Sequence, residues 1–299
     1  MKKAERSRPS PDLAQASVQL FAVTPEGPEP LPVGQDARSA HELFDSLPLG
    51  VYSALRTFDH QRFLRLEQHF DRTDRSLELL GWDERLDRSA LRRALHQTVG
   101  AYPGPDAFVR FDVLAEAPRS LGIQRRTLLA LSPLVLVPER FLQEGVSVLF
   151  TPLRRARPLV KTASFVLERR PYPLGRQDAY EHLLVDEVGR ILEGTSSNFL
   201  AIENGALRLA GEDALQGITQ RVVVEIATSL GLGAVREPVR CCQLERVEEA
   251  FLTGSTRGIV PVIEVDGQRI GNGRPGAWTE RLRHAYLEFA WAHARPALP

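Results

Sequence analysis

The sequence predicts a mixed α/β (α+β) fold with a small N-terminal α/β domain and a larger C-terminal domain. With 299 residues, the chain has the length of about two domains of ordinary size. Strand-like runs and helical patterns occur in both halves, but they do not follow the regular β-α-β order of a doubly wound sheet. No glycine-rich fingerprint follows a predicted strand, so we expect neither a Rossmann fold nor a P-loop.

The overall composition excludes several classes of protein. The 38 basic and 38 acidic residues balance, which argues against a nucleic-acid binder. No apolar run approaches the ~18 residues needed to cross a bilayer, and no hydrophobic stretch follows the charged N-terminus as in a signal peptide. Cys241 and Cys242 are adjacent, which fits neither a disulfide framework nor a zinc site. We therefore expect a cytoplasmic protein with no nucleic-acid, membrane or metal partner.

The N-terminal domain is expected at residues 13–132, after a disordered tail at 1–12. Three runs have the β-branched and aromatic residues that are typical of strands. They span residues 17–23, 51–58 and 107–114.

Two helices are predicted in the same domain. The first lies near 62–80 and stops at Gly81, a residue type at which helices commonly end. Its apolar face has four residues at helical spacing, namely Phe63, Leu66, Phe70 and Leu77. The second helix lies near 89–99, with Ser89 as its candidate N-cap.

A linker is predicted at 133–145, where two prolines bracket the segment, and the C-terminal domain at 146–299. Asn204-Gly205 and Asp266-Gly267 favour two-residue hairpin turns. The strands of this domain are predicted near 147–151, 181–186, 198–202, 207–209, 249–253 and 259–265, and its helices near 219–230 and 277–290.

A single interior lysine is the most informative residue of the chain. Of the 38 Lys and Arg residues, only Lys2, Lys3 and Lys161 are lysines, so the other 35 are arginines. A lysine amine can lose its proton and attack a carbonyl, whereas arginine stays protonated. Lys161 is therefore a candidate nucleophile, and the alternative is that it was retained by chance in an arginine-rich chain.

Four segments of the second half have an unusual composition. Taken separately, each has a structural explanation, because polar turns, glycine loops and a Thr219 helix cap are common. Together they supply what a pyridoxal phosphate site requires: an amine, a carboxylate that faces the pyridine nitrogen, and donors around a phosphate. The segments are VKTASF at 160–165, ILEGTSSNF at 191–199, LQGITQ at 215–220 and FLTGSTRGIVPV at 251–262.

The groups of this predicted site can be assigned from their positions. Lys161 can supply the amine, and Glu193, before a glycine turn, can supply the carboxylate. Gly217, Ile218 and Thr219 stand at a predicted helix start, where free N–H groups and the helix dipole favour an anion.

Further donors come from two other segments. Gly254, Ser255 and Thr256 can add N–H and hydroxyl groups. In the first helix, three polar residues share a stripe at spacings of three and four, and Arg72 can supply a full positive charge to the phosphate; the stripe is formed by His69, Arg72 and Ser76.

In the order and spacing of these segments, the sequence resembles the class IV aminotransferases, which are pyridoxal phosphate enzymes of fold type IV. That group includes branched-chain aminotransferases, D-amino-acid aminotransferases and aminodeoxychorismate lyase. The resemblance runs from about Leu49 to Tyr286 and is strongest over 180–262. It implies a barrel-like C-terminal domain, pyridoxal 5′-phosphate as cofactor and a homodimer.

The resemblance also implies roles for individual residues. Lys161 matches the Schiff-base lysine, and Glu193 the carboxylate at the pyridine nitrogen. Ile218 with Thr219, and Ser255 with Thr256, match the two arms of the phosphate clamp, and Arg72 matches the phosphate-binding arginine. Tyr52, Arg110 and Gly254 are expected to line the substrate pocket, with Arg110 at the substrate carboxylate.

The substrate side departs from the family pattern. Ser164 replaces a usual Asn, Gln220 a usual Arg or Lys, and Gly258 a common Glu, and Leu-Ala-Glu follows at 114–116 where Thr-Arg-Gly is usual. We expect an enzyme that transfers an amino group between an amino acid, most often a branched-chain one, and a 2-keto acid. The alternatives are a D-amino-acid aminotransferase, an aminodeoxychorismate lyase that forms 4-aminobenzoate, a Schiff-base lyase without cofactor and, last, a non-catalytic relative.

Overall fold

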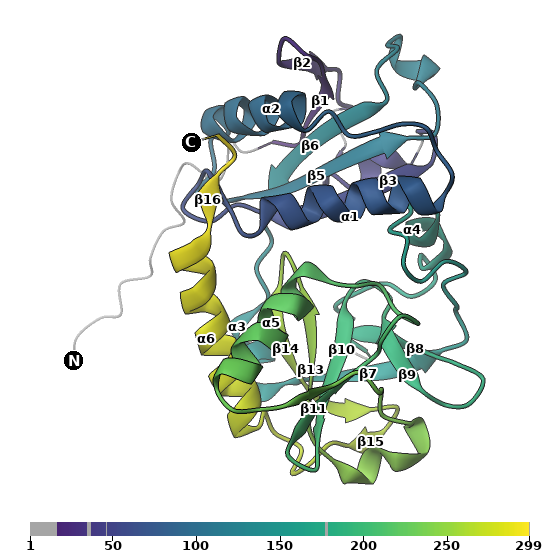
Figure 1. Cartoon of the computed structure of the whole chain (residues 1–299), viewed down its shortest axis with the longest axis vertical. Helices are drawn as coiled ribbons and strands as arrows, with labels where there is room; N and C mark the ends of the chain where they lie inside the picture. Colours follow the sequence, from purple (N-terminus) through teal and green to yellow (C-terminus); the bar gives the residue numbers. More distant parts are fainter. Residues whose placement is uncertain (1–16, 35–36, 46, 177–178, 299) are drawn as a thin grey trace, which may run out of the picture.

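The computed structural model describes residues 17–34, 37–45, 47–176 and 179–298. The tail predicted at 1–12 lies outside these residues. Figure 1 shows two lobes, with the elements up to β6 in the upper lobe and most later elements in the lower one. The mixed α/β class predicted from the sequence is confirmed.

The upper lobe is built on a five-stranded antiparallel sheet with the order β2-β1-β6-β5-β3. The sequence predicts three of these strands, but not β2, which contains two prolines, or β6, which runs into the segment interpreted as a linker. The strands are β1 (Gln19–Val23), β2 (Pro28–Leu31), β3 (Gly50–Arg56), β5 (Ala107–Leu114) and β6 (Thr127–Pro133).

Two helices pack with this sheet, α1 (Leu66–Leu79) and α2 (Arg88–Ala101). Their apolar side chains share one core with β5 and β6, in which Phe70 of α1 meets Phe111 of β5 edge-on. α1 ends as predicted, because Gly81 has φ +71°, the left-handed conformation that terminates helices.

The predicted N-cap of α2 is wrong by two residues. The cap is Asp87, whose Oδ1 accepts a hydrogen bond of 2.9 Å from the Ala90 N–H, and Ser89 is already inside the helix. A carboxylate at this place also interacts favourably with the positive end of the helix dipole.

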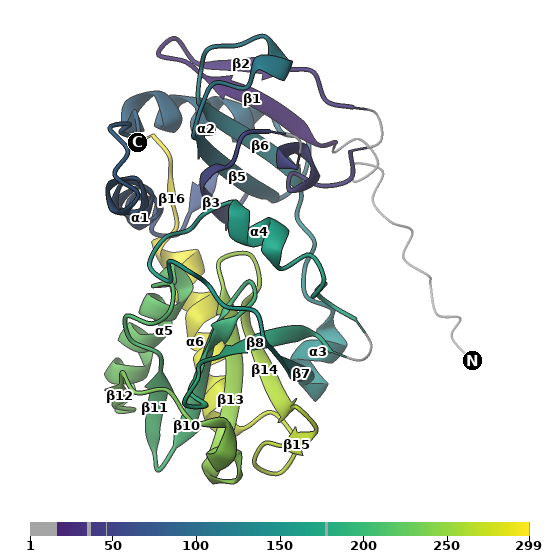
Figure 2. The same ribbon diagram turned by 90° about the vertical axis from the view of Figure 1, so that its right-hand side faces the viewer.

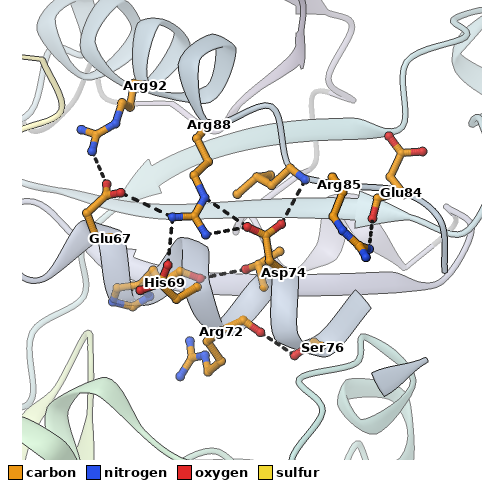
Figure 3. A network of polar contacts seen from close by, with 12 residues as sticks. Glu67, His69, Arg72, Asp74, Ser76, Glu84, Arg85, Arg88 and Arg92 are labelled. Carbon is orange, nitrogen blue, oxygen red and sulfur yellow. Dashed lines mark hydrogen bonds and ion pairs between the residues drawn. The ribbon is translucent and has the colours of Figure 1, made fainter. Parts of the chain in front are cut away.

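Ion pairs hold α1 against α2, as Figure 3 shows. Arg88 binds Asp74 at 2.6 Å, and Arg92 binds Glu67. The Arg72 side chain leaves α1 on the other side and points away from this network. One face of α1 is therefore fixed within the upper lobe, and Arg72 belongs to the opposite face.

The lower lobe is built on a nine-stranded mixed sheet. Six of its strands, in the order β10-β13-β14-β7-β8-β9, form a closed ring because β9 also pairs with β10. This closure is the barrel-like sheet that the resemblance implies. The strands are β7 (Val146–Thr151), β8 (Glu181–Val185), β9 (Ile191–Gly194), β10 (Asn198–Glu203), β11 (Ala206–Leu209), β12 (Ala234–Val235), β13 (Val247–Gly254), β14 (Gly258–Val265) and β15 (Gln268–Arg269).

Two tight turns in this sheet are confirmed. Asn204 and Gly205 have φ values of +52° and +66° between β10 and β11, and Asp266 and Gly267 have +50° and +79° between β14 and β15. Two consecutive positive φ values are what a type I′ hairpin turn requires, and Asn-Gly and Asp-Gly tolerate them best.

Two long helices, α5 (Ile218–Ser229) and α6 (Ala277–His293), cover the barrel and share a core with β10, β11, β13 and β14. Both were predicted within three residues. Among the helices that the structure describes, none is long and apolar enough to cross a membrane.

Short elements complete the chain. Helix α3 (Glu139–Glu144) lies in the segment between β6 and β7, and α4 (Ser164–Glu168) lies between the lobes in both views (Figures 1 and 2). The 3-10 turns are η2 (Glu42–Phe44), η3 (Arg119–Leu121) and η4 (Cys241–Arg246).

The end of the described chain returns to the upper lobe (Figure 1). There β16 (Arg295–Pro296) pairs with β4 (Arg62–Phe63), and Ala297 is buried in the core of α1 and α2. The end of the segment expected to form the C-terminal domain, 146–299, therefore packs on the upper lobe. No local sequence pattern indicates the pairing of β16 with β4.

Candidate active site

A cavity of about 220 Å³ lies between the lobes. The upper lobe contributes Tyr52 of β3 and Arg72 of α1, and most of the other lining residues come from the lower lobe and the segments that join the two. Of the predicted site residues, all but Arg110 line this cavity: Tyr52, Arg72, Lys161, Glu193, Gly217, Ile218, Thr219, Gly254, Ser255 and Thr256.

Lys161 is fixed by its backbone to the upper lobe. Its carbonyl accepts a hydrogen bond of 3.0 Å from the Tyr52 N–H, and its N–H donates to Ser76 Oγ over 3.3 Å. Thr162, the next residue, forms an antiparallel β-bridge with Val51 of β3. The lysine is thus held at the edge of the upper sheet while its side chain reaches the cavity.

The Lys161 amine is prepared for nucleophilic chemistry. Burial, together with the charges of Arg72 and Arg155, lowers its pKa from 10.5 to about 8. Nζ lies 4.8 Å from the centre of the Tyr52 ring. Burial alone raises the pKa of Tyr52, but Lys161 and nearby arginines outweigh it and lower that pKa to about 7.

Glu193 lies on β9 at the point where the barrel closes, opposite Asn198 of β10. Oε1 accepts a hydrogen bond of 2.7 Å from Nε of Arg155, and Oε2 accepts one of 3.3 Å from the Leu215 N–H. Burial raises the pKa of this carboxyl, and the Arg155 charge opposes that effect. Arg155 therefore favours the ionised carboxylate that a protonated pyridine nitrogen needs as its partner.

The start of α5 is shaped by three residues. Asn198 Nδ2 donates to the Leu215 carbonyl at 2.6 Å, and the Gln220 side chain accepts from the Gly217 N–H at 3.2 Å. A Cβ at position 217 would collide with Asn198, so the close approach requires glycine. The N-cap is Gly217 and not Thr219, which is the second residue of the helix.

This helix start can bind an anion. The first N–H groups of a helix have no acceptor within it, and those of Ile218 and Thr219 lie at the cavity. Arg72 is buried, and Ser53 Oγ, at 2.9 Å, is its hydrogen-bond partner there. A buried guanidinium beside a neutral hydroxyl and a helix N-terminus is suited to a phosphate.

The polar stripe of α1 is buried and serves three contacts. Ser53 Oγ, which accepts from Arg72, is 2.8 Å from Nδ1 of His69 and donates to it. Burial and the Arg72 charge lower the pKa of His69 well below its usual value, so the imidazole is neutral and accepts this bond. Ser76 Oγ accepts a hydrogen bond from the Lys161 N–H, so the stripe contacts both the lysine and the arginine of the predicted site.

A second turn at the cavity runs from Gly254 to Gly258, between β13 and β14. Arg257 in this turn binds Glu181 at 2.9 Å and donates to Ser196 Oγ at 2.6 Å. Glu181 also accepts from the Ser196 N–H at 2.5 Å. These contacts on the buried Glu181 carboxylate join the turn after β9 to the turn after β13.

The residues that depart from the family pattern on the substrate side have structural roles in this chain. Gln220 caps the start of α5, and Ser164 Oγ donates to Thr162 Oγ1 at 2.9 Å. Gly258 has φ +68°, a conformation that a Glu adopts only with strain, and a Cβ there would lie 3.3 Å from Tyr286.

Arg110 is the predicted residue that does not line the cavity. It forms a bidentate pair with Asp112, with both bonds at 2.7 Å, and its Nη1 donates to Nδ1 of His41 at 2.9 Å. Both members of the pair are buried, so the guanidinium is already neutralised within the upper sheet. The expectation that Arg110 meets the substrate carboxylate disagrees with this geometry.

The donor set of the cavity fits pyridoxal phosphate. It combines one amine, one buried carboxylate, a helix N-terminus and a buried arginine around a common space. Among the described residues, the hydroxyls of Ser197 and Thr253 are also buried at the cavity without a protein partner. Buried polar groups are normally satisfied, so these hydroxyls indicate a polar ligand.

Sequence reasoning missed five residues of the site: Arg155, Arg257, Arg169, Asn198 and His41. Three are arginines in a chain with 35 of them, where residue type carries no signal. Asn198 and Arg257 stand inside the predicted site segments 191–199 and 251–262, so the sequence indicates their positions but not their roles.

Comparisons with known proteins agree on one family. The family model described as amino-transferase class IV matches residues 50–265. A putative branched-chain-amino-acid aminotransferase of Methanocaldococcus jannaschii is 28% identical over 254 residues, which cover 80% of this chain and 86% of the relative. A D-alanine aminotransferase of Bacillus licheniformis is 26% identical over 79% of this chain and 86% of its own length.

A solved structure has the same fold. The branched-chain amino acid aminotransferase of Thermoproteus uzoniensis, solved with norvaline, matches with a TM-score of 0.72 and 20% identity. The match covers 93% of this chain and 99% of that one.

Proposed function

Because the chain belongs to the class IV aminotransferase family, we propose that it transfers an amino group from a branched-chain amino acid to a 2-keto acid. One observation carries this proposal. The Lys161 amine reaches a cavity that has the Glu193 carboxylate and the start of α5 in its walls. Bound pyridoxal 5′-phosphate supplies the electron sink that lets a bond at the substrate α-carbon ionise.

The roles of the residues follow from their chemistry. Lys161 Nζ holds the cofactor and moves the proton at the substrate α-carbon, for which its lowered pKa of about 8 is suited. Glu193 keeps the pyridine nitrogen protonated. Arg72 binds the phosphate together with the free N–H groups of Ile218 and Thr219 at the start of α5. The turn that follows β13 adds Ser255 and Thr256, while Gly217, whose N–H is bonded to Gln220, allows the close approach.

The walls of the cavity support an aliphatic substrate. Ala54, Phe108, Val135 and Leu174 line it beside Tyr52 and can contact a hydrocarbon side chain. The Methanocaldococcus jannaschii relative has a branched-chain name, which agrees. The D-alanine aminotransferase among the relatives makes D-amino acids the second candidate donors.

The wider organisation is also proposed. We propose a cytoplasmic homodimer, since the resemblance to the family implies a dimer. We also propose that residues 133–145 link two domains, which agrees with the two lobes of Figure 2. Analytical ultracentrifugation of the purified protein tests the dimer, since a homodimer has twice the mass of a monomer.

The proposed reaction is tested with a panel of donors. Purified protein loaded with pyridoxal phosphate is incubated with L-leucine, L-valine, L-glutamate and D-alanine, each with 2-oxoglutarate or pyruvate, and the keto acids are measured. We expect turnover to be fastest with L-leucine or L-valine. Turnover of D-alanine alone would assign the second candidate, and release of pyruvate and 4-aminobenzoate from aminodeoxychorismate would assign a lyase.

A further inference from the structure

Among the residues that the structure describes, five cationic side chains line the cavity: Arg72, Arg155, Lys161, Arg169 and Arg257. Two of them have a carboxylate partner within the protein. Arg155 is paired with Glu193, and Arg257 with Glu181, which is fully buried. Their charges are therefore neutralised before any ligand binds.

The function proposed above engages two more. Arg72 faces the phosphate, and Lys161 holds the cofactor. The present inference rests on those assignments, because they leave Arg169 as the cation of the cavity wall that has no assigned anion.

Arg169 directly follows α4, the short helix between the lobes (Figure 2). It is half-buried, and Nη1 donates to the Thr195 carbonyl at 2.9 Å. It forms no ion pair within the described part of the chain. The hydrogen bond fixes one side of the guanidinium and leaves the other N–H groups for a ligand.

The neighbours of Arg169 show that its charge acts at the reactive end of the cavity. It contributes to the lowered pKa of His41, of Tyr52 and of Lys161. Arg169 and Lys161 line the same cavity, so a substrate bound to Arg169 occupies the space that the lysine amine reaches.

His41 lines the same cavity as a neutral donor. Its Nδ1 accepts from Arg110 at 2.9 Å, which leaves the ring proton on Nε2. Burial and the Arg110 charge lower its pKa to about 3, so it stays neutral at physiological pH. Arg110 is itself neutralised by Asp112, so this pair of residues orients His41 without adding a net charge.

We propose that Arg169 binds a carboxylate of the amino-acid and keto-acid substrates, with Nε2–H of His41 as a second donor. A guanidinium is a planar fork that matches a carboxylate, and it cannot lose its charge at working pH. Phe108 and Leu174 line the same cavity and can contact the hydrocarbon part of the substrate. Either the α-carboxylate or a distal carboxylate can occupy the fork.

Calorimetric titration of the loaded enzyme tests this inference without turnover. The probes are 4-methylvalerate, its amide, and glutarate, which all lack an α-amino group. For Arg169→Gln we expect the Kd of glutarate, and that of 4-methylvalerate as well if the fork holds the α-carboxylate, to rise about 10- to 150-fold, as for a lost charge-assisted hydrogen bond. The Kd of the amide should change little. Arg169→Lys retains a charge but not the fork, so its effect is intermediate.

Arg170→Gln is the matched control. Arg170 is the next residue, is exposed, pairs with Asp45 at 2.7 Å and does not line the cavity. Its replacement removes the same charge but leaves the Kd of every probe unchanged. Thermal unfolding and cofactor content of all variants show whether they are folded.

The probes also distinguish the two carboxylates. A loss confined to glutarate assigns Arg169 to a distal carboxylate, and an equal loss for both acids assigns it to the α-carboxylate. Equal weakening of acid and amide means that Arg169 only holds the Thr195 turn, and it overturns the proposal, as does an unchanged Kd for both acids. Wild-type protein that binds the acids through Arg169 but transfers no amino group refutes the proposed function alone.

Discussion

Nε of Arg155 donates a 2.7 Å hydrogen bond to Oε1 of Glu193 at the wall of the cavity between the lobes. The same guanidinium lies 3.7 Å from the centre of the Phe165 ring, so it is held between a carboxylate and an aromatic face. Burial raises the pKa of the Glu193 carboxyl, and the Arg155 charge is the largest effect that lowers it. The arginine thus controls the ionisation of the carboxylate proposed to meet the pyridine nitrogen.

Replacement of Arg155 should affect rate more than binding. In Arg155→Leu the Glu193 carboxyl loses its counter-charge, its pKa rises, and less of it is ionised at pH 7. We expect the half-reaction with donor alone to slow by about 10- to 150-fold, the equivalent of one charge-assisted hydrogen bond. The rate should recover partly as the pH is raised, because higher pH restores the carboxylate.

Arg154→Leu is the control for this experiment, since Arg154 is the exposed neighbour and pairs only with Glu187 at 3.4 Å within the described residues. It should react as the wild type does. Equal slowing in both variants would mean that the segment is merely disturbed.

Glu193→Gln separates an electronic role from a structural one. Glutamine is nearly the same size and can still accept from Arg155, so cofactor binding should be retained. The half-reaction should slow by roughly 10- to 150-fold, because a neutral amide stabilises a protonated pyridine less. kcat should fall much more than KM rises. Single-turnover absorbance measurements check this, and a near-native rate would reduce Glu193 to a turn residue.

The Lys161 amine should become reactive at a lower pH than ordinary lysine. Burial and neighbouring cations disfavour the ammonium form, so the neutral amine predominates above about pH 8 instead of 10.5. Competitive acetylation of cofactor-free protein by acetic anhydride, read by peptide mapping, should therefore rise about tenfold between pH 7 and 9 and then level off.

In the same experiment Lys161→Arg should show no label at this position, and it should lose transamination although the charge remains. Acetylation that keeps rising beyond pH 9 would contradict the lowered pKa.

Arg72→Ala should weaken the binding of the cofactor phosphate. The guanidinium is buried, with a hydroxyl as its partner, and the loss of its contact to a phosphate should raise the Kd of pyridoxal phosphate by about 10- to 150-fold. Arg75→Ala is the comparison, because Arg75 is on the same helix but exposed and paired with Glu78. Equilibrium dialysis measures both, and equal affinities would remove Arg72 from the phosphate site.

The pair of Arg110 and Asp112 predicts an effect on stability. Asp112→Asn leaves a buried arginine without a counter-charge, which typically costs about 3–5 kcal/mol. The free energy of unfolding in urea should fall by that amount. The double variant Arg110→Met/Asp112→Leu should recover most of it, because no buried charge remains. A stable Asp112→Asn protein would show that Arg110 has another anion.

Local signals in the sequence predicted much of this fold. The glycine at 81 ends α1, two I′ turns fall at Asn204 and Asp266, and the long helices begin near the expected residues. Each depends on neighbours within a few positions, which a single sequence displays. The four segments around the cavity were recognised for the same reason, because each one is short and continuous.

Contacts between distant segments were not predictable in this way. The closure of the barrel at Glu193 and Asn198, and the pairing of β16 with β4, bring together residues whose local patterns name no partner. Arginine partners were hidden for a different reason. Since nearly all cations of the chain are arginine, burial and geometry alone distinguish Arg155 or Arg110 from a surface residue.

The pairing of β16 with β4 also sets an order of events during protein synthesis. Domains generally fold as units as they emerge from the ribosome, but here the first lobe lacks Ala297 in its core, and the Arg92 bond of 2.8 Å to the Ala297 carbonyl, until residue 297 is available. By then the strands of the barrel, which lie between β4 and β16 in the sequence, have already been synthesised. The core of the upper lobe is therefore completed last. In a ribosome-bound chain that stops at residue 290, we expect the upper lobe to be sensitive to protease.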